Sequence, residues 1–563
     1  MGSPAGARAG SERVSPAARR ALGGLAGAAA MIAAVTVLSR LLGFGRWLLQ
    51  ASEVGPGVIG DAYNSANLLP NVLFEVAAGG ALAGALVPLL TGPIARGDRR
   101  EVERTASGAL GWTLLVLAPL AVLLAALSTP IAHALAHTSD QVDLIRFFIL
   151  VFAVQVPLYG VAVLLYAVLQ AHKRFFWPAF APVISSLVVM TTYVVYGALA
   201  NGEQSDPAAL ESQALDVLAW GTTLGVAAMC LPMFVPVRRL GVRLRPTLRF
   251  PHGVGRRLRH LALAGVGAVA AQQLALLVIM KVAWWQPYAQ EGTLTRFLYT
   301  QQVYLLPYAV LVVPLATSSF PRIAARASAG DRVGFARMAA VTTRGVLIAA
   351  GAGVAVVVAA ATAVATVFAV VADDATVADE MGPALTWMMP GLVGFALLFH
   401  VSRTLYALER GRLAVAANVV GWGVVAVAAV VLVRAQVPAG GAVVAIGAAS
   451  SIGMLAGGGS ALVLLRRAAG GGALTGVVRT LAVLAGAVTV AGATGRWVAD
   501  TVQDVAGHGL WTAVGAGAGG AVVALVVVAG AVALLDRRTA VDVLRVERTP
   551  VPASAPVVEL PDE

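Results

Sequence analysis

Long apolar stretches recur through the whole chain, and they constrain its fold more than any other feature of the sequence. Each is close to the ~20 residues that an α-helix needs to cross the ~30 Å hydrocarbon core of a membrane. The chain has 563 residues, of which 59% are hydrophobic and only 12% are charged. This composition excludes a soluble domain with a polar coat. The stretches lack the alternation of membrane strands, so they predict an all-α polytopic membrane protein.

We predict fourteen membrane helices, preceded by a basic leader over residues 1–21 and followed by a cytoplasmic tail over residues 538–563. The approximate bounds of the helices are 22–50, 66–92, 106–136, 144–171, 175–200, 214–237, 260–285, 294–320, 339–371, 382–408, 412–434, 441–466, 474–495 and 510–536.

Lys and Arg residues follow every second predicted helix, and this alternation predicts the orientation of the chain. Basic loops include residues 96–104, 238–259 and 322–337, whereas the loops at 201–212 and 372–380 contain carboxylates but no Lys or Arg. Short basic loops stay on the cytoplasmic side. Both termini are therefore expected in the cytoplasm. Topology and anionic lipid explain the net charge of +12, so no nucleic-acid partner is expected.

Short sequence echoes indicate an internal repeat. LYAVLQ, ending at residue 170, resembles LYALER, ending at residue 410, and VPLLT at 87–91 resembles VPLAT at 313–317. Each echo lies six predicted helices after its original. We therefore expect two six-helix lobes related by a parallel repeat, over 22–240 and 241–470, and a C-terminal helix pair within 471–537.

Two arginines interrupt the first apolar stretch, within TVLSRLLGFGRW at residues 36–47. A charge at the centre of a membrane helix costs at least a few kcal/mol, so Arg40 and Arg46 are candidate functional residues. A guanidinium binds phosphate bidentately and stays charged at any relevant pH. Gly43 and Gly45 favour a bend that would turn both arginines toward one cavity. The alternative is a straight helix, with Arg46 reaching outward to the interface and Arg40 in a buried ion pair.

The second predicted helix adds three candidates. Glu75 is expected at a depth similar to that of Arg40, so the two could pair, either for function or for structure alone. Glu75 could instead take up H⁺ or Na⁺ and couple transport to an ion gradient. Pro70 predicts a kink in this helix, and Asp61 is expected in the outer loop as a helix cap or gate contact.

Lys281 and Arg403 are further candidate cations. The repeat matches Lys281 with Arg40, and transporters built from repeats bind substrate between their halves. The alternative is that Lys281 reaches to the outer interface beside Trp284. Arg403 shares a helix face with His400. It lies either at the cytoplasmic mouth of a cavity or among inner-leaflet headgroups, while His400 is more typical of hydrogen-bonded packing.

Signatures of enzymes are absent from the sequence. It has no glycine-rich phosphate loop ending in Lys-Ser/Thr, no cluster with metal-ligand spacing, and a single cysteine, Cys230. We therefore expect no catalytic residues, no metal and no cofactor. The membrane potential, H⁺ and Na⁺ remain open as energy sources.

Several motifs together resemble the MurJ/MviN family of lipid II flippases, within the superfamily of multidrug and oligosaccharidyl-lipid exporters. They are SRLLGFGR (39–46), DAY (61–63), LPN (69–71), LVP (86–88) and KRFFWPAFAP (173–182). The resemblance implies two six-helix lobes around a central cavity, a C-terminal helix pair and alternating access. It implies that lipid II, the undecaprenyl-diphosphate-linked peptidoglycan precursor, moves from the inner to the outer leaflet of the bacterial inner membrane. Membrane lipids and cell-wall synthesis proteins are the other expected partners.

The resemblance also assigns roles to residues. In the family, two arginines of the first helix line the cavity and are needed for activity, and they correspond to Arg40 and Arg46. The chain departs from the family at Trp47, where an aspartate is usual, and at Glu75 and Gln302, where arginines are usual. Two alternatives follow from these departures: a flippase for another polyprenyl-linked glycan, and a transport-inactive membrane scaffold for cell-wall synthesis.

Overall fold

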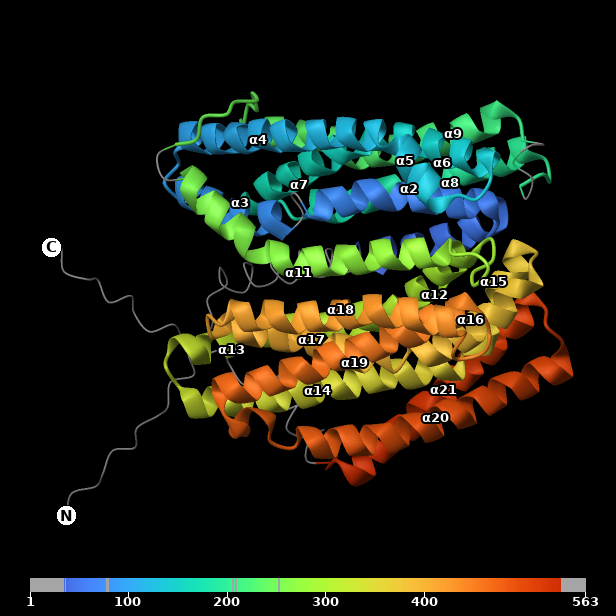
Figure 1. The fold of residues 1–563 in the computed structure, drawn as a ribbon. Coiled ribbons are helices and arrows are strands. Elements are labelled where there is room, and N and C mark those ends of the chain that lie inside the picture. Colours follow the sequence, from blue (N-terminus) through green and yellow to red (C-terminus); the bar gives the residue numbers. More distant parts are fainter. Residues whose placement is uncertain are drawn as a thin grey trace, which may run out of the picture.

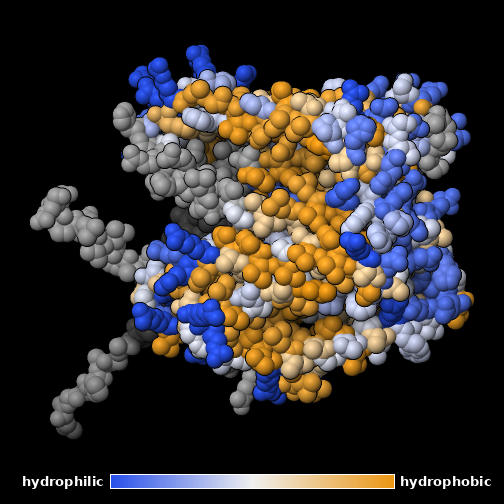
Figure 2. Space-filling model, viewed as in Figure 1, coloured by the Kyte–Doolittle hydropathy of each residue, from blue (hydrophilic) through white to orange (hydrophobic). Residues whose placement is uncertain are grey.

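The computed structural model describes residues 37–76, 80–204, 210–251 and 254–537, together with residues 35 and 207. Every regular element in these ranges is helical, which confirms the all-α class. The helices run roughly parallel between two ends of the molecule (Figure 1). Figure 2 shows an apolar band between hydrophilic ends on one face, as membrane insertion requires. The predicted leader (1–21) and tail (538–563) lie outside the described residues.

The first part of the chain forms the N-terminal group, which comprises the helices within residues 37–239. It begins with a helix over residues 37–53, here called the first helix. The others are α2 (Val58–Phe74), α3 (Gly80–Ala95), α4 (Arg99–Ala126), α5 (Ser128–Leu135), α6 (Ser139–Ala153), α7 (Gln155–Ala171), α8 (Phe176–Ala200), α9 (Ser212–Cys230) and α10 (Phe234–Arg239).

The second part forms the C-terminal group, which comprises α12 to α21. Between the two groups lies α11 (Val254–Ala283), which contacts both α3 and α18 (Figure 1). A π-helical segment over Tyr308–Val312 joins α12 to α13. The helices of the group are α12 (Thr293–Pro307), α13 (Val313–Ser328), α14 (Arg332–Ala359), α15 (Ala361–Ala372), α16 (Ala375–Met388), α17 (Gly391–Ala407), α18 (Gly411–Ala435), α19 (Ala442–Ala469), α20 (Val477–Ala506) and α21 (Leu510–Leu535).

Each predicted membrane helix overlaps one helix, or consecutive helices, of the structure. Among the described residues, ten spans are long and apolar enough to cross a membrane, or eleven if α16 and α17, bent by 47°, count as one. The total of fourteen stays a prediction. Asp61 was expected in a loop, but α2 already begins at Val58. The loop placement is wrong because Asp61 and Asn64 are buried with hydrogen-bond partners, so their polarity does not exclude them from the helix.

At three equivalent points of the predicted repeat, a helix end in each half has a residue with positive φ. Helices α4 and α14 each have 28 residues and an aspartate N-cap, Asp98 and Asp331, whose side chain accepts a backbone N–H. The layout of two six-helix lobes and a terminal pair stays a prediction, but these matches support the repeat. The matched residues with positive φ are Gly97 and Gly330 before α4 and α14, Lys173 and Glu409 after α7 and α17, and Asn201 and Gln436 after α8 and α18.

The basic loops gather at one end of the molecule. In Figure 1 the α3–α4 and α13–α14 connections lie at the left, whereas the α15–α16 connection, with Asp373 and Asp374, lies at the right. The backbone N–H of Arg243 donates to Glu103 at 2.9 Å, so the loop after α10 lies against the start of α4. We call these the basic end and the acidic end.

Close helix packing in the C-terminal group depends on glycines that face a neighbour. A Cβ added at Gly458 of α19 would lie 2.6 Å from the carbonyl oxygen of Gly394 in α17, whereas one added at the adjacent Gly459 would meet nothing within 4 Å. We expect Gly458→Ala to lower the free energy of unfolding by about 1–3 kcal/mol, because α17 and α19 must separate. Gly459→Ala is the matched control. Thermal unfolding of the full chain in detergent measures both, and equal melting temperatures would contradict this packing.

Candidate central cavity

A cavity of about 610 Å³ lies between the first helix, α2, α8, α9 and α12. Its volume is within the range of small-molecule binding sites. Most of its wall comes from the N-terminal group, and the C-terminal group adds Gln302, Leu305, Leu306 and Ala309. Polar side chains reach it from several helices: Ser39, Arg40, Arg46, Gln50, Tyr63, Asn64, Asn67, Tyr159, Ser185, Ser186, Tyr193, Thr222 and Gln302.

Arg40 and Arg46 both line this cavity. The first helix is unbroken at Gly43 and Gly45, so the two long side chains reach one space without local unwinding. None of the ion pairs among the described residues includes either arginine. Among the described residues, the buried ion pair of the alternative for Arg40 is therefore not formed. Two permanent positive charges that no described carboxylate pairs with make the cavity suited to an anion.

The tyrosines around Arg46 form a hydrogen-bonded wall. The Tyr63 hydroxyl lies 3.0 Å from those of both Tyr193 and Thr222. Arg46 lines the same cavity as Tyr63, Tyr159 and Tyr193. This end of the cavity therefore offers neutral hydroxyls beside one guanidinium.

Glu75 and Lys281 do not line the central cavity. Glu75 is half-buried in a π-helical turn after α2, and no ion pair among the described residues joins it to Arg40. Lys281 is exposed in the last turn of α11, and its ammonium donates to the carbonyl of Ala134 in α5. The structure thus agrees with a lysine that reaches along the protein surface, and the proposed match with Arg40 does not bring it to the cavity.

Arg403 is not among the residues that line the cavity. Its guanidinium donates to the Thr317 hydroxyl at 2.9 Å and lies 4.2 Å from the ring centroid of Phe399. His400 is buried and lies 3.1 Å from the Thr342 hydroxyl, as expected for a packing histidine.

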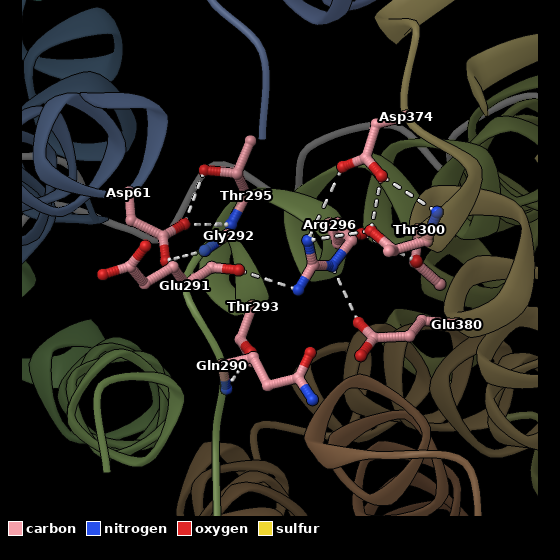
Figure 3. A network of polar contacts seen from close by, with 11 residues as sticks. Asp61, Gln290, Glu291, Gly292, Thr293, Thr295, Arg296, Thr300, Asp374 and Glu380 are labelled. Atoms are coloured by element: carbon pink, nitrogen blue, oxygen red, sulfur yellow. Dashed lines mark hydrogen bonds and ion pairs between the residues drawn. The ribbon is translucent and has the colours of Figure 1, made fainter. Parts of the chain in front are cut away.

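Asp61 forms a contact between the two helix groups toward the acidic end, and we call this contact the closure. It lies in the first turn of α2, only 2% exposed, and its carboxylate accepts from the backbone N–H groups of Gly292 at 2.9 Å and Thr295 at 2.8 Å (Figure 3). The Thr295 hydroxyl adds a third bond at 2.7 Å. Asp61 is therefore a helix cap, as the sequence suggested, but the helix that it caps is α12. This contact joins the N-terminal group to the C-terminal group.

Arg296 is the buried charge that sequence reasoning missed. Its side chain is 4% exposed, and its Nε lies 2.7 Å from a carboxylate oxygen of Glu380 in α16. It also donates to the carbonyl of Glu291 at 2.8 Å and lies 4.0 Å from Asp374 (Figure 3). The signals were present, because a lone arginine begins an apolar span and the 372–380 loop is acidic. Nothing in the sequence indicated that they meet.

A line of hydrogen bonds runs from the cavity wall to the Asp61 carboxylate. Gln50 donates to Asn64 at 3.1 Å, Asn64 donates to the Thr295 hydroxyl at 3.0 Å, and Thr295 donates to Asp61 at 2.7 Å. All four residues are at most 4% exposed, and both Gln50 and Asn64 line the cavity. Two residues of the cavity wall are therefore connected to the Asp61 carboxylate by hydrogen bonds.

The fold and the cavity define a polytopic membrane protein built like a transporter, with two groups of helices around a polar space closed at one end. Solved structures share this fold. One is lipid II flippase MurJ in an inward closed conformation, with a TM-score of 0.68 and 16% identity over 90% of this chain and 99% of that one. Another is an inward-facing multidrug resistance MATE family transporter of the MOP superfamily, with a TM-score of 0.62 and 14% identity over 81% and 98%.

The family model of lipid II flippase MurJ matches residues 50–514, and the chain therefore belongs to this family. That is a family of transporters, and Arg40 and Arg46 lie just before the matched residues. Relatives include probable lipid II flippases MurJ from Rhizobium meliloti (strain 1021), 27% identical over 54% of this chain and 55% of that protein, and from Vibrio cholerae, 27% identical over 54% and 58%. The chain spans about half the length of the curated relatives that it matches.

The Arg296–Glu380 pair gives a prediction about stability. Arg296→Met should lower the free energy of unfolding by about 3–5 kcal/mol, because it leaves the Glu380 carboxylate largely buried without its partner. The double variant Arg296→Met/Glu380→Leu should recover part of that loss. Thermal unfolding in detergent measures both. The control is Arg96→Ala, which removes an exposed pair with Glu101 and should cost less than about 1 kcal/mol. A double variant no more stable than the Arg296 variant would refute the pairing argument.

Proposed function

We propose that this protein moves lipid II from the inner to the outer leaflet of the bacterial inner membrane by alternating access of its two helix groups. One observation carries the proposal: Arg40 and Arg46 share a cavity, and no ion pair among the described residues neutralises either of them. Membership of the lipid II flippase MurJ family supports the choice of substrate.

The chemistry of the substrate explains why such a cavity is needed. A diphosphate-linked glycan is too polar to cross ~30 Å of hydrocarbon unaided. A polar cavity gives the headgroup an aqueous path, and guanidinium groups bind the diphosphate through bidentate, charge-assisted hydrogen bonds. Because arginine does not deprotonate at any relevant pH, this binding does not depend on a proton supply.

Alternating access requires that the closure at the acidic end separates. The contact of Asp61 with α12 joins the two groups and must break, whereas the Arg296–Glu380 pair lies within the C-terminal group and stays intact. Arg296 would thus keep α12 attached to α16 while the groups move apart. A helix cap is worth about 0.5–2 kcal/mol, which is a cost that substrate binding can offset.

The proposed orientation places the basic end in the cytoplasm and the acidic end outside. In that orientation an anionic headgroup moves outward, and an inside-negative membrane potential favours that movement by ~2.3 kcal/mol per charge for each 100 mV. The membrane potential is therefore our first choice of energy source.

The departures from the family pattern do not favour another function. Trp47 and Gln302 both line the cavity and carry no charge, and Glu75 lies outside the wall. The two cavity arginines remain in place beside these changes. A glycan carrier of different specificity or an inactive scaffold therefore gains no support from the geometry.

The proposal predicts the effect of losing each cavity arginine. Arg40→Ala and Arg46→Ala should each weaken the binding of purified protein to lipid II by roughly tenfold or more, because each removes a charged hydrogen-bond donor. Neither variant should restore lipid II exposure on the outer leaflet of cells depleted of the wild-type protein. Arg434→Ala, at the exposed end of α18, is the control and should restore it. Unimpaired binding and exposure in both variants, at normal expression, would exclude the proposed site.

A further inference from the structure

Three amide side chains form an uncharged part of the cavity wall between Arg46 and the closure at the acidic end. We propose that Gln50, Asn64 and Asn67 bind the hydroxyl- and amide-bearing part of the headgroup, and that this binding loosens the Asp61 cap on α12. The inference rests on the proposed function, because it deepens the account of the same cavity.

The amides have unused hydrogen-bonding capacity. The Asn67 side-chain oxygen is buried without a partner, and the Gln50 side-chain oxygen accepts no hydrogen bond from the described residues. A buried polar atom left unpaired costs free energy, so a ligand that donates to it is favoured. Amides both donate and accept, which matches the hydroxyls of a sugar and the amides of an N-acetyl group or peptide.

The amides and the arginines are arranged so that one ligand can reach both. Gln50 follows Arg46 by four residues, so the two share a face of the first helix. Asn64 and Asn67 are three residues apart on α2 and face the same cavity. A diphosphate bound to the arginines would therefore carry its attached glycan toward the amides. Charge separates the two subsites, because one is cationic and the other neutral.

A ligand bound at the amides changes the hydrogen bonds that connect them to Asp61, and in this way it weakens the closure. Asn64 uses its oxygen for Gln50 and its nitrogen for Thr295. A ligand that accepts a hydrogen bond from the Gln50 amide nitrogen competes with the first of these bonds, and a ligand that binds the Asn64 amide competes with both. Because the donors all point toward Asp61, each bond polarises the next, and breaking the first weakens the rest. The cap that joins the two groups would then be held by fewer and weaker bonds.

The test measures opening of the acidic end directly. Val58, 8% exposed in the first turn of α2, is replaced by cysteine in a Cys230→Ser background, and its modification by a bulky polyethylene-glycol maleimide is timed in nanodiscs. Lipid II should speed the modification by about fivefold, the factor expected for loss of a hydrogen bond. Undecaprenyl diphosphate, which has the diphosphate but no glycan, should bind without speeding it.

Variants separate sensing from binding and from closure. Gln50→Leu/Asn67→Leu should abolish the response to lipid II while leaving the affinity for undecaprenyl diphosphate unchanged. Thr295→Val, which removes the hydroxyl from the line, should speed modification about fivefold without any lipid. Asn418→Ala is the matched control, because this amide bonds to Ser402 far from the cavity wall, and it should behave like the parent. Melting temperatures within about 3 °C of the parent confirm that each variant is folded.

Two results would overturn the inference, and a different one would overturn the proposed function. A full response to lipid II in the Gln50→Leu/Asn67→Leu protein, or an unchanged basal rate in Thr295→Val, excludes sensing by the amides. If neither lipid II nor undecaprenyl diphosphate binds to the parent protein, the proposed function itself fails.

Discussion

The contact between the two helix groups depends on the hydrogen bonds that the buried carboxylate of Asp61 accepts from the start of α12. A charge that is only 2% exposed requires compensation, and the free N–H groups at the start of α12 provide it. Because these partners belong to the other helix group, satisfying the charge also brings α2 and α12 together. Arg296 follows directly after Thr295, whose N–H binds Asp61, and its ion pair with Glu380 fixes α12 to α16. The closure thus depends on two buried charges: Asp61, which binds the start of α12, and Arg296, which pairs with Glu380.

Three arginines lie within apolar stretches of the chain, and their partners differ. Arg296 is buried, pairs with Glu380 and also donates to the carbonyl of Glu291, so all of these partners lie within the protein. Arg40 and Arg46 face a cavity, and no ion pair among the described residues includes them. In a membrane protein an unmatched charge persists only where water or a ligand can solvate it. The presence or absence of a carboxylate partner among the described residues therefore distinguishes Arg296 from Arg40 and Arg46, although all three are arginines.

The sequence predicted the all-α class and singled out the two arginines that line the cavity, because hydropathy and charge within an apolar stretch are local properties of the chain. The total of fourteen membrane helices stays a prediction. The sequence placed Asp61 in a loop, because a carboxylate near the end of an apolar stretch resembles a connection unless its partner is known. That partner, Thr295, lies more than two hundred residues away. The six-helix spacing of the repeat matched Lys281 to Arg40. That spacing does not determine where a side chain points, and Lys281 does not line the cavity. Arg296 and Glu380 were visible singly, but their pairing depends on how α12 packs on α16, which no local pattern encodes.

The change at Trp47 shows how a departure from the family pattern fits this structure. Trp47 packs edge-on against Tyr299 of α12, with ring centroids 6.0 Å apart, and Tyr299 in turn stacks on Phe368 of α15 at 5.3 Å. Phe44, one turn earlier in the first helix, also meets Phe368. These contacts add apolar packing to the hydrogen-bonded closure beside them. The tryptophan therefore adds apolar contacts between the first helix and the C-terminal group.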